Sequence, residues 1–97
     1  MLAARPDLVK TKGDGHAWEI ETALMLATCP HLVQGTAPAE WPSFPKHLLV
    51  RDKRRYWPGG VWGDPGQATK EQGEAILEAE VEQLQMVIEK IEKGISP

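Results

Sequence analysis

The chain has 97 residues, of which 41% are hydrophobic and 26% charged, a length that fits one small domain and excludes a second core of ordinary size. Its single cysteine, Cys29, excludes an internal disulfide and favours the reducing cytoplasm as its location. The net charge of −3 argues against general nucleic-acid binding, and no stretch approaches the roughly 18 apolar residues of a membrane span, so neither a nucleic acid nor a membrane is expected as a partner.

The first predicted helix covers residues 14–29. Apolar side chains recur there at helical spacing, and Pro30 ends the pattern. Every residue from Ala23 to Ala27 is apolar. We therefore expect the second half of this helix to be buried on more than one face, as in a helix packed against a sheet and a neighbour.

Loops and one strand are predicted in the middle of the chain. Residues 30–46 contain four prolines, which predicts a long, stiff loop. The apolar segment His47–Val50 is the best strand candidate, and the basic run after it, residues 51–55, is interpreted as a solvated turn, with phosphate contact as the alternative. Residues 56–66 combine two Trp and a Tyr with four Gly and two Pro, which is typical of an ordered loop that serves a site.

A second helix is predicted to begin after Thr69, because Thr69 and Gln72 match a capping box, and to end at Gly94. Its apolar stripe is expected to pack on a sheet, and consists of Ile76, Leu77, Val81, Leu84, Val87 or Ile88, and Ile91. Two helices and one strand cannot close a sheet. The chain is therefore interpreted as part of a domain.

Two segments carry motifs. Residues 15–33 resemble the HAGxxETS-type motif of the creatininase (creatinine amidohydrolase) family, through His16, Ala17, Glu21, Thr22, Pro30, Leu32 and Val33. Residues 60–77 are similar to that family's GVxGDPxxATxEKGxxxL pattern, through Gly60, Val61, Gly63, Asp64, Pro65, Ala68, Thr69, Glu71, Gly73 and Leu77.

The resemblance implies an α/β fold class. Residues 1–97 would form a single partial domain, the C-terminal part of a three-layer α/β fold with two helices, at least one strand and long ordered loops. Family members are metal-dependent amidohydrolases, usually hexamers, whose zinc or manganese ligands lie in an N-terminal portion. This chain lacks those ligand motifs, so no metal ligand is assigned in it. The implied partners are a small amide-type substrate and either further copies of the chain, as a homo-oligomer, or a complementary N-terminal chain.

The resemblance assigns His16 and Glu21 to proton transfer beside the substrate, a task that suits an imidazole. A spacing of five puts the two side chains about 140° apart on an ideal helix, so they meet only if His16 lies outside the helix. Trp18 stands where the family has glycine, which predicts a substrate other than creatinine. The candidate substrate-binding residues are Trp18, Trp57 and Trp62. Trp57 and Trp62 could equally form part of the hydrophobic core.

Two functions follow from these assignments. The first is a creatininase-like, metal-dependent hydrolase of a cyclic or linear amide-type bond, present as a truncated or split C-terminal segment that is inactive alone. The alternative is a non-catalytic interaction protein, derived from the family, that docks a partner chain through its apolar helix faces. Cys29 and His31 are too few ligands to predict a metal site of their own.

Overall fold

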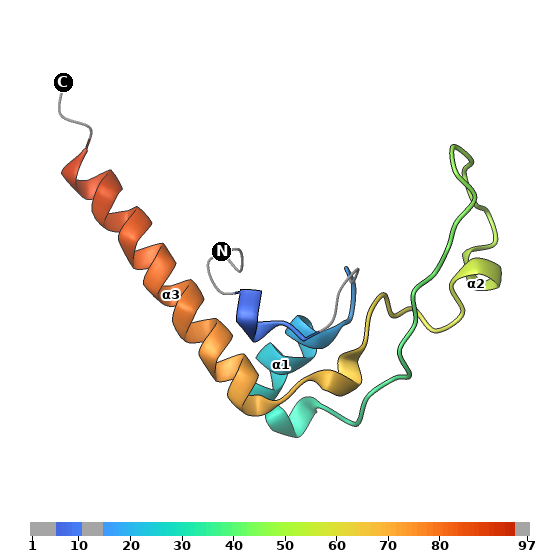
Figure 1. Ribbon diagram of the computed structural model, residues 1–97, viewed down its shortest axis with the longest axis horizontal. Helices are drawn as coiled ribbons and strands as arrows, with labels where there is room; N and C mark the ends of the chain where they lie inside the picture. Colours follow the sequence, from blue (N-terminus) through green and yellow to red (C-terminus); the bar gives the residue numbers. More distant parts are fainter. Residues whose placement is uncertain (1–5, 11–14, 95–97) are drawn as a thin grey trace.

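A computed structural model describes residues 6–10 and 15–94 of the chain. Its two long helices are α1 (Glu19–Thr28) and α3 (Lys70–Lys93), as Figure 1 shows. Four single-turn helices complete the described elements: η2 (Pro6–Leu8), η3 (Pro30–Leu32), α2 (Lys53–Tyr56) and η4 (Pro65–Gln67). None of the helices in these two ranges is long and apolar enough to cross a membrane.

The expected α/β architecture is wrong, because the described residues contain no sheet. They form only two isolated antiparallel bridges, His16 with Trp62 and Glu40 with Gly63. The predicted strand at residues 47–50 is also wrong, since Leu48 is 70% and Leu49 100% exposed. A strand is stable only when a neighbour pairs with its backbone, and the left-handed φ of +63° at His47 further interrupts an extended run.

Helix α1 begins five residues later than the periodicity indicated, because the chain turns sharply before it. Ala17 adopts a φ of +49°, a left-handed conformation that separates His16 from the helix. The backbone N–H of Ala17 donates to Glu21 Oε2 at 2.7 Å. Pro30 occupies the first position of η3, so α1 ends at Thr28, as predicted from Pro30.

The predicted capping box at the start of α3 is confirmed. The N–H of Gln72 donates to Thr69 Oγ1 at 3.1 Å, and the N–H of Thr69 donates to Gln72 Oε1 at 3.4 Å. Gly94 ends the helix with a φ of +68°, which glycine adopts without steric cost, so the predicted end is confirmed as well.

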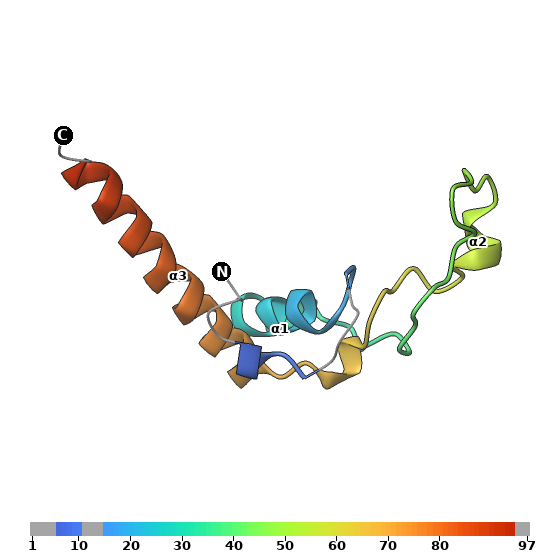
Figure 2. The ribbon, with the colours of Figure 1, turned by 45° about the horizontal axis from the view of Figure 1, so that its top comes forward.

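The core lies where α1 crosses the first turns of α3 (Figures 1 and 2). Ile20, Ala23 and Ile76 are buried there. Gly73 permits this close approach, because a Cβ atom on it would lie 1.9 Å from the carbonyl oxygen of Ala23. The small residues at this contact therefore bring the two helices together.

Beyond this core the molecule is open. Its radius of gyration is 17.2 Å, against about 12.5 Å for a compact domain of this length. In Figure 1, α3 extends away from α1 in one direction, and residues 41–60, which we call the arm, extend in the other. The prediction that a sheet covers the apolar stripe of α3 is wrong. Only Ile76, at the start of the stripe, is buried, and it packs against α1. No described element covers the rest of the stripe, whose residues are 38 to 73% exposed: Leu77, Val81, Leu84, Val87, Ile88 and Ile91.

Candidate functional site

His16 is held against the aromatic loop by its backbone. The N–H groups of Gly15 and His16 donate to the carbonyl oxygen of Trp62 at 2.9 and 3.3 Å, and the N–H of Trp62 donates back to the carbonyl oxygen of His16 at 2.8 Å. The exposed imidazole meets the ring of Trp57 edge-on, with 5.5 Å between the ring centroids. The tertiary structure thus joins the two motif segments at His16.

Glu21 contacts the same turn from inside α1. Its carboxylate accepts the Ala17 N–H and so stabilises a left-handed residue that has a Cβ atom, a conformation that alanine rarely adopts. His16 lies outside the helix, as the spacing required, but no hydrogen bond joins its ring to Glu21 within the described ranges. The two residues are connected through the backbone of Ala17. Glu21 is therefore placed to position His16.

An open hollow of about 300 Å³ lies beside this turn. Glu21 and Thr22 contribute its polar groups, while Met25, Leu32 and Val33 contribute apolar surface; Ala17, Gln34 and Gly35 complete the lining. Of the two carboxylate oxygens of Glu21, only Oε2 accepts a hydrogen bond from a described residue. The hollow can therefore present a carboxylate oxygen to a small polar molecule.

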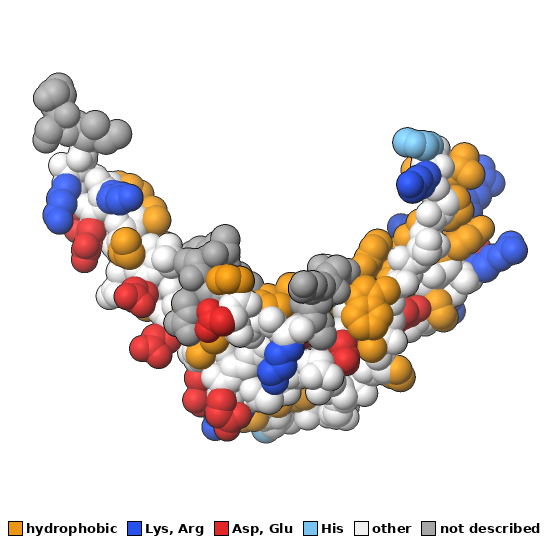
Figure 3. All heavy atoms as spheres, viewed as in Figure 1, with side chains coloured by type: hydrophobic (Ala, Val, Ile, Leu, Met, Phe, Trp, Pro, Cys, Tyr) orange, Lys and Arg blue, Asp and Glu red, His pale blue; other side chains and the backbone are white. Residues whose placement is uncertain are grey.

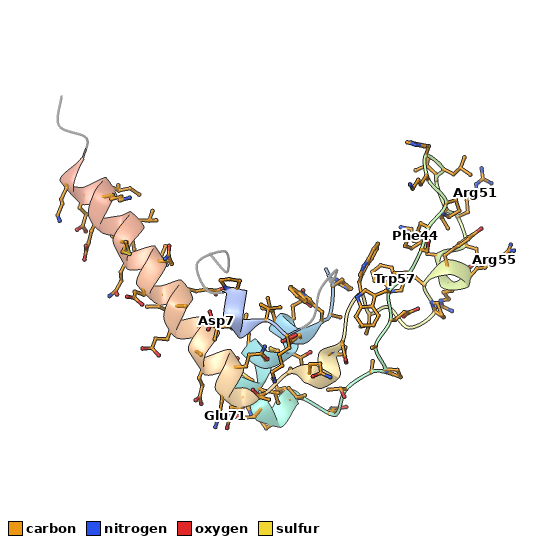
Figure 4. All side chains as sticks on the ribbon, in the orientation of Figure 1. Asp7, Phe44, Arg51, Arg55, Trp57 and Glu71 are labelled. Atoms are coloured by element: carbon orange, nitrogen blue, oxygen red, sulfur yellow. The ribbon has the colours of Figure 1, made fainter. Side chains whose placement is uncertain are left out.

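The arm and Trp62, which follows it, form an aromatic cluster next to His16. Trp57 and Trp62 meet at 5.6 Å between centroids, and Phe44 lies 6.1 and 6.2 Å from their respective rings, as Figure 4 shows for the labelled Phe44 and Trp57. Tyr56 lies 6.1 Å from Phe44. Phe44 was not among the predicted site residues, although its position between Pro42 and Pro45 in a stiff loop was a signal.

Hydrogen bonds hold the loop that carries these rings. Trp57 Nε1 donates to the carbonyl oxygen of Val61 at 2.7 Å, which closes the turn between the two tryptophans. Glu40 pairs with Gly63 through its backbone, and its Oε1 accepts the N–H of Gly59 at 3.0 Å. The loop is therefore ordered, as predicted, by contacts from a segment some 20 residues earlier in the chain.

Trp18 lies apart from this cluster. It is half-buried, makes no ring contact with another described residue, and occupies the N-cap position of α1. Its φ of −112° is one that any residue adopts, so the backbone accommodates tryptophan where the family motif has glycine. Of the three predicted tryptophans, the structure brings only Trp57 and Trp62 to His16.

The described residues do not fit a metal ion. No group of three or more His, Cys, Asp or Glu side chains converges among residues 6–10 and 15–94. Two side chains such as Cys29 and His31 do not complete a coordination shell. The metal that the family requires therefore has no matching donor set in this part of the chain.

One comparison with known proteins gives a match. The family model described as creatinine amidohydrolase matches residues 1–88, nearly the whole length. No curated protein and no solved structure matches the chain. The match includes both the His16–Glu21 turn and the aromatic loop that packs on it, and the family indicates an amidohydrolase-type function. The chain belongs to the creatininase (creatinine amidohydrolase) family.

Proposed function

We propose that this chain supplies the proton-transfer and substrate-facing part of a metal-dependent amidohydrolase, and that a complementary portion of the enzyme supplies the metal ligands. One observation carries the proposal. His16 stands outside α1, its backbone is paired with Trp62, and its turn is held by Glu21, so an exposed imidazole is fixed beside an open hollow and an aromatic cluster.

His16 is the proposed catalytic residue. Hydrolysis of an amide requires a proton to reach the leaving nitrogen, and a positioned histidine side chain can deliver it. Neither ring nitrogen of His16 hydrogen-bonds to another described residue, so both are available to a substrate. Glu21 acts as a positioning residue through Ala17. Trp57 and Trp62 would form an apolar wall for the substrate, with Trp18 further away.

The zinc or manganese expected for the family would supply the activated water, but the described residues do not gather ligands for it, so no step is assigned to it here. We infer that residues 1–97 are the C-terminal part of a larger domain, either truncated or split, and that they are inactive alone. The exposed stripe of α3 and the large radius of gyration support this inference. The lone thiol of Cys29 is compatible with a cytoplasmic location.

The test is complementation. The chain is co-expressed with the metal-ligating N-terminal portion of a complete family member, and metal-dependent hydrolysis of a panel of cyclic and linear amides is measured. His16→Ala should lower kcat by about 10² to 10⁴, the usual contribution of a general acid or base, with metal content unchanged. His31→Ala is the matched control, because His31 is exposed in η3 and outside the site, and it should keep the activity.

Three results would contradict the proposal. Turnover by the purified chain alone, abolished by a chelator, would show that no complementary portion is needed. Loss of metal from His16→Ala would make this residue a ligand. Wild-type kcat in His16→Ala would leave it a structural role only. Stable binding of the complementary portion without turnover of any amide would favour the alternative, a non-catalytic docking protein, which the exposed apolar surface of α3 also suits.

A further inference from the structure

An acidic groove lies beside the α1–α3 contact, away from the proposed catalytic residues. It encloses about 620 Å³ and is lined by Ala27, Glu74, Leu77, Glu78, Val81, Glu82 and Gln85. The three glutamates are spaced four residues apart and form one row along α3, and Leu77 and Val81 belong to the adjacent row. A ligand of this groove would meet apolar surface next to a line of carboxylates.

The charges of this groove are mostly unpaired. Glu74 lies 3.9 Å from Lys70, both exposed, whereas Glu78 and Glu82 form no ion pair with a described residue. Leu77 and Val81 are 38 and 49% exposed. Because α3 as a whole carries seven Glu against three Lys, a net of −4, the groove favours an occupant that is both basic and apolar.

The arm of this same protein is both basic and apolar. Residues 48–55 contain four Lys or Arg against one Asp, a net of +3. The side chains of Leu48 and Leu49 are 70 and 100% exposed in front of this basic run. Arg55 lies over the ring of Tyr56, 5.7 Å from its centroid, while Arg51, Lys53 and Arg54 form no ion pair with a described residue. Figure 3 shows acidic side chains along α3 and basic ones on the opposite arm.

We propose that residues 48–55 of a second copy of this chain bind in the groove, with Leu48 and Leu49 against Leu77 and Val81, and the basic side chains along the row of glutamates. The arm and α3 of one copy diverge in both ribbon views, so the segment cannot occupy its own groove (Figures 1 and 2). Each copy offers both surfaces, so the exchange is reciprocal and forms a closed dimer. Direct pairing of two α3 helices would instead oppose like charges.

The test uses charge reversal in the full chain, with the oligomeric state measured by light scattering and analytical ultracentrifugation. The wild-type chain should be a dimer at low salt and dissociate as salt rises, because exposed ion pairs are screened. Two double variants should each raise the dimer Kd about tenfold or more: the arm variant, Arg51→Glu with Arg54→Glu, and the groove variant, Glu78→Lys with Glu82→Lys. Glu89→Lys with Glu92→Lys, the same charge change on α3 outside the groove, is the matched control and should leave the Kd unchanged.

Mixing the arm variant with the groove variant gives the sharpest readout. In the mixed pair each reversed surface faces its complement, so a one-to-one dimer should form more tightly than the dimer of either variant alone. Circular dichroism of each variant shows that α3 is retained. A wild-type monomer at low salt would overturn the proposal. So would a dimer that the arm variant leaves intact, since the α3 helices would then pair directly, or a mixture that does not associate.

Discussion

At the scale of single residues, the buried carboxylate of Glu19 organises the fold. Glu19 is fully buried and accepts the backbone N–H of Lys10, with distances of 2.7 and 3.1 Å to its two oxygens. The side-chain amide of Gln72 donates to both Glu19 and the carbonyl oxygen of Leu8. These bonds join the segment before α1, α1 itself and the start of α3. This side chain therefore serves the core.

We predict that Glu19 and Gln72 stabilise the fold as one unit. Glu19→Ala and Gln72→Ala should each lower the free energy of unfolding by about 1 to 3 kcal/mol, because each removes hydrogen bonds from a buried polar network. The double variant should lose less than the sum of the two, as expected for residues in one network. Urea unfolding followed by circular dichroism measures all three, with exposed Glu89→Ala as the control. Additive losses would show that the two side chains act independently.

At the scale of elements, the contact between α1 and α3 depends on a missing side chain. Any Cβ atom at position 73 would fall 1.9 Å from the carbonyl oxygen of Ala23 and 3.0 Å from the Cβ of Ala27. These neighbours are backbone and a short side chain, so they cannot move aside without moving α1. The glycine of the family pattern therefore has a steric role in this chain.

Gly73→Ala should separate the two helices. Alanine favours a helix by about 1 kcal/mol over glycine, but overpacking of this contact should outweigh that gain and lower the free energy of unfolding by about 1 to 3 kcal/mol net. Gly15→Ala is the control, because apart from its chain neighbours no described atom lies within 4 Å of a Cβ built there. Denaturant unfolding compares the two variants, and a Gly73→Ala chain more stable than the wild type would show that the helices are not in close contact.

The start and the middle of the α3 stripe should respond differently to truncation. Ile76 is fully buried and Leu84 is 52% exposed. Ile76→Ala should cost about 2 to 5 kcal/mol through lost burial and a cavity, whereas Leu84→Ala should cost about 0.5 kcal/mol or less. Thermal and urea unfolding of the pair measures this difference. Equal losses would mean that an element covers Leu84 in solution.

At the scale of the whole molecule, packing and hydrogen bonding are unevenly distributed along the chain. The packed centre contains α1, the start of α3 and η4. The arm is held by a few hydrogen bonds and its aromatic contacts, and two backbone bridges pair the residues that flank its base. Few backbone hydrogen bonds and much exposed surface are typical of segments that open at low free-energy cost. The arm is therefore expected to be the least stable part of the described chain.

Hydrogen exchange should reveal this distribution. At high salt, where charge pairing between copies is screened, amides in the crossing of α1 and α3 should exchange slowest, and those of residues 46–52 fastest. Within the arm and its neighbours, the bridged amides of Glu40, Trp62 and Gly63 should be intermediate. Mass spectrometry of peptic fragments measures these rates. Uniform protection along the arm would contradict the observed hydrogen-bonding pattern.

The sequence by itself determined the features that depend on neighbouring residues. Thr69 and Gln72 define the start of α3 through a local capping box, Gly94 defines its end through a backbone conformation, and Pro30 ends α1. The order of the two motif segments was also sufficient to identify the family. Each of these signals acts over a few residues, so it can be read without knowledge of the fold.

Only the tertiary structure decided which segments of the chain pack against each other. Residues 47–50 have an apolar composition suited to a strand, but a strand requires a partner distant in sequence, and the described chain provides none. The stripe of α3 has the period of a buried helix face, yet burial depends on a covering element, so only its first turns are packed. The burial of Glu19 and the contact of Phe44 with Trp57 likewise depend on segments far apart in the chain. Periodicity shows which face of an element is apolar, whereas the surface that covers that face is a non-local property that only the packed chain decides.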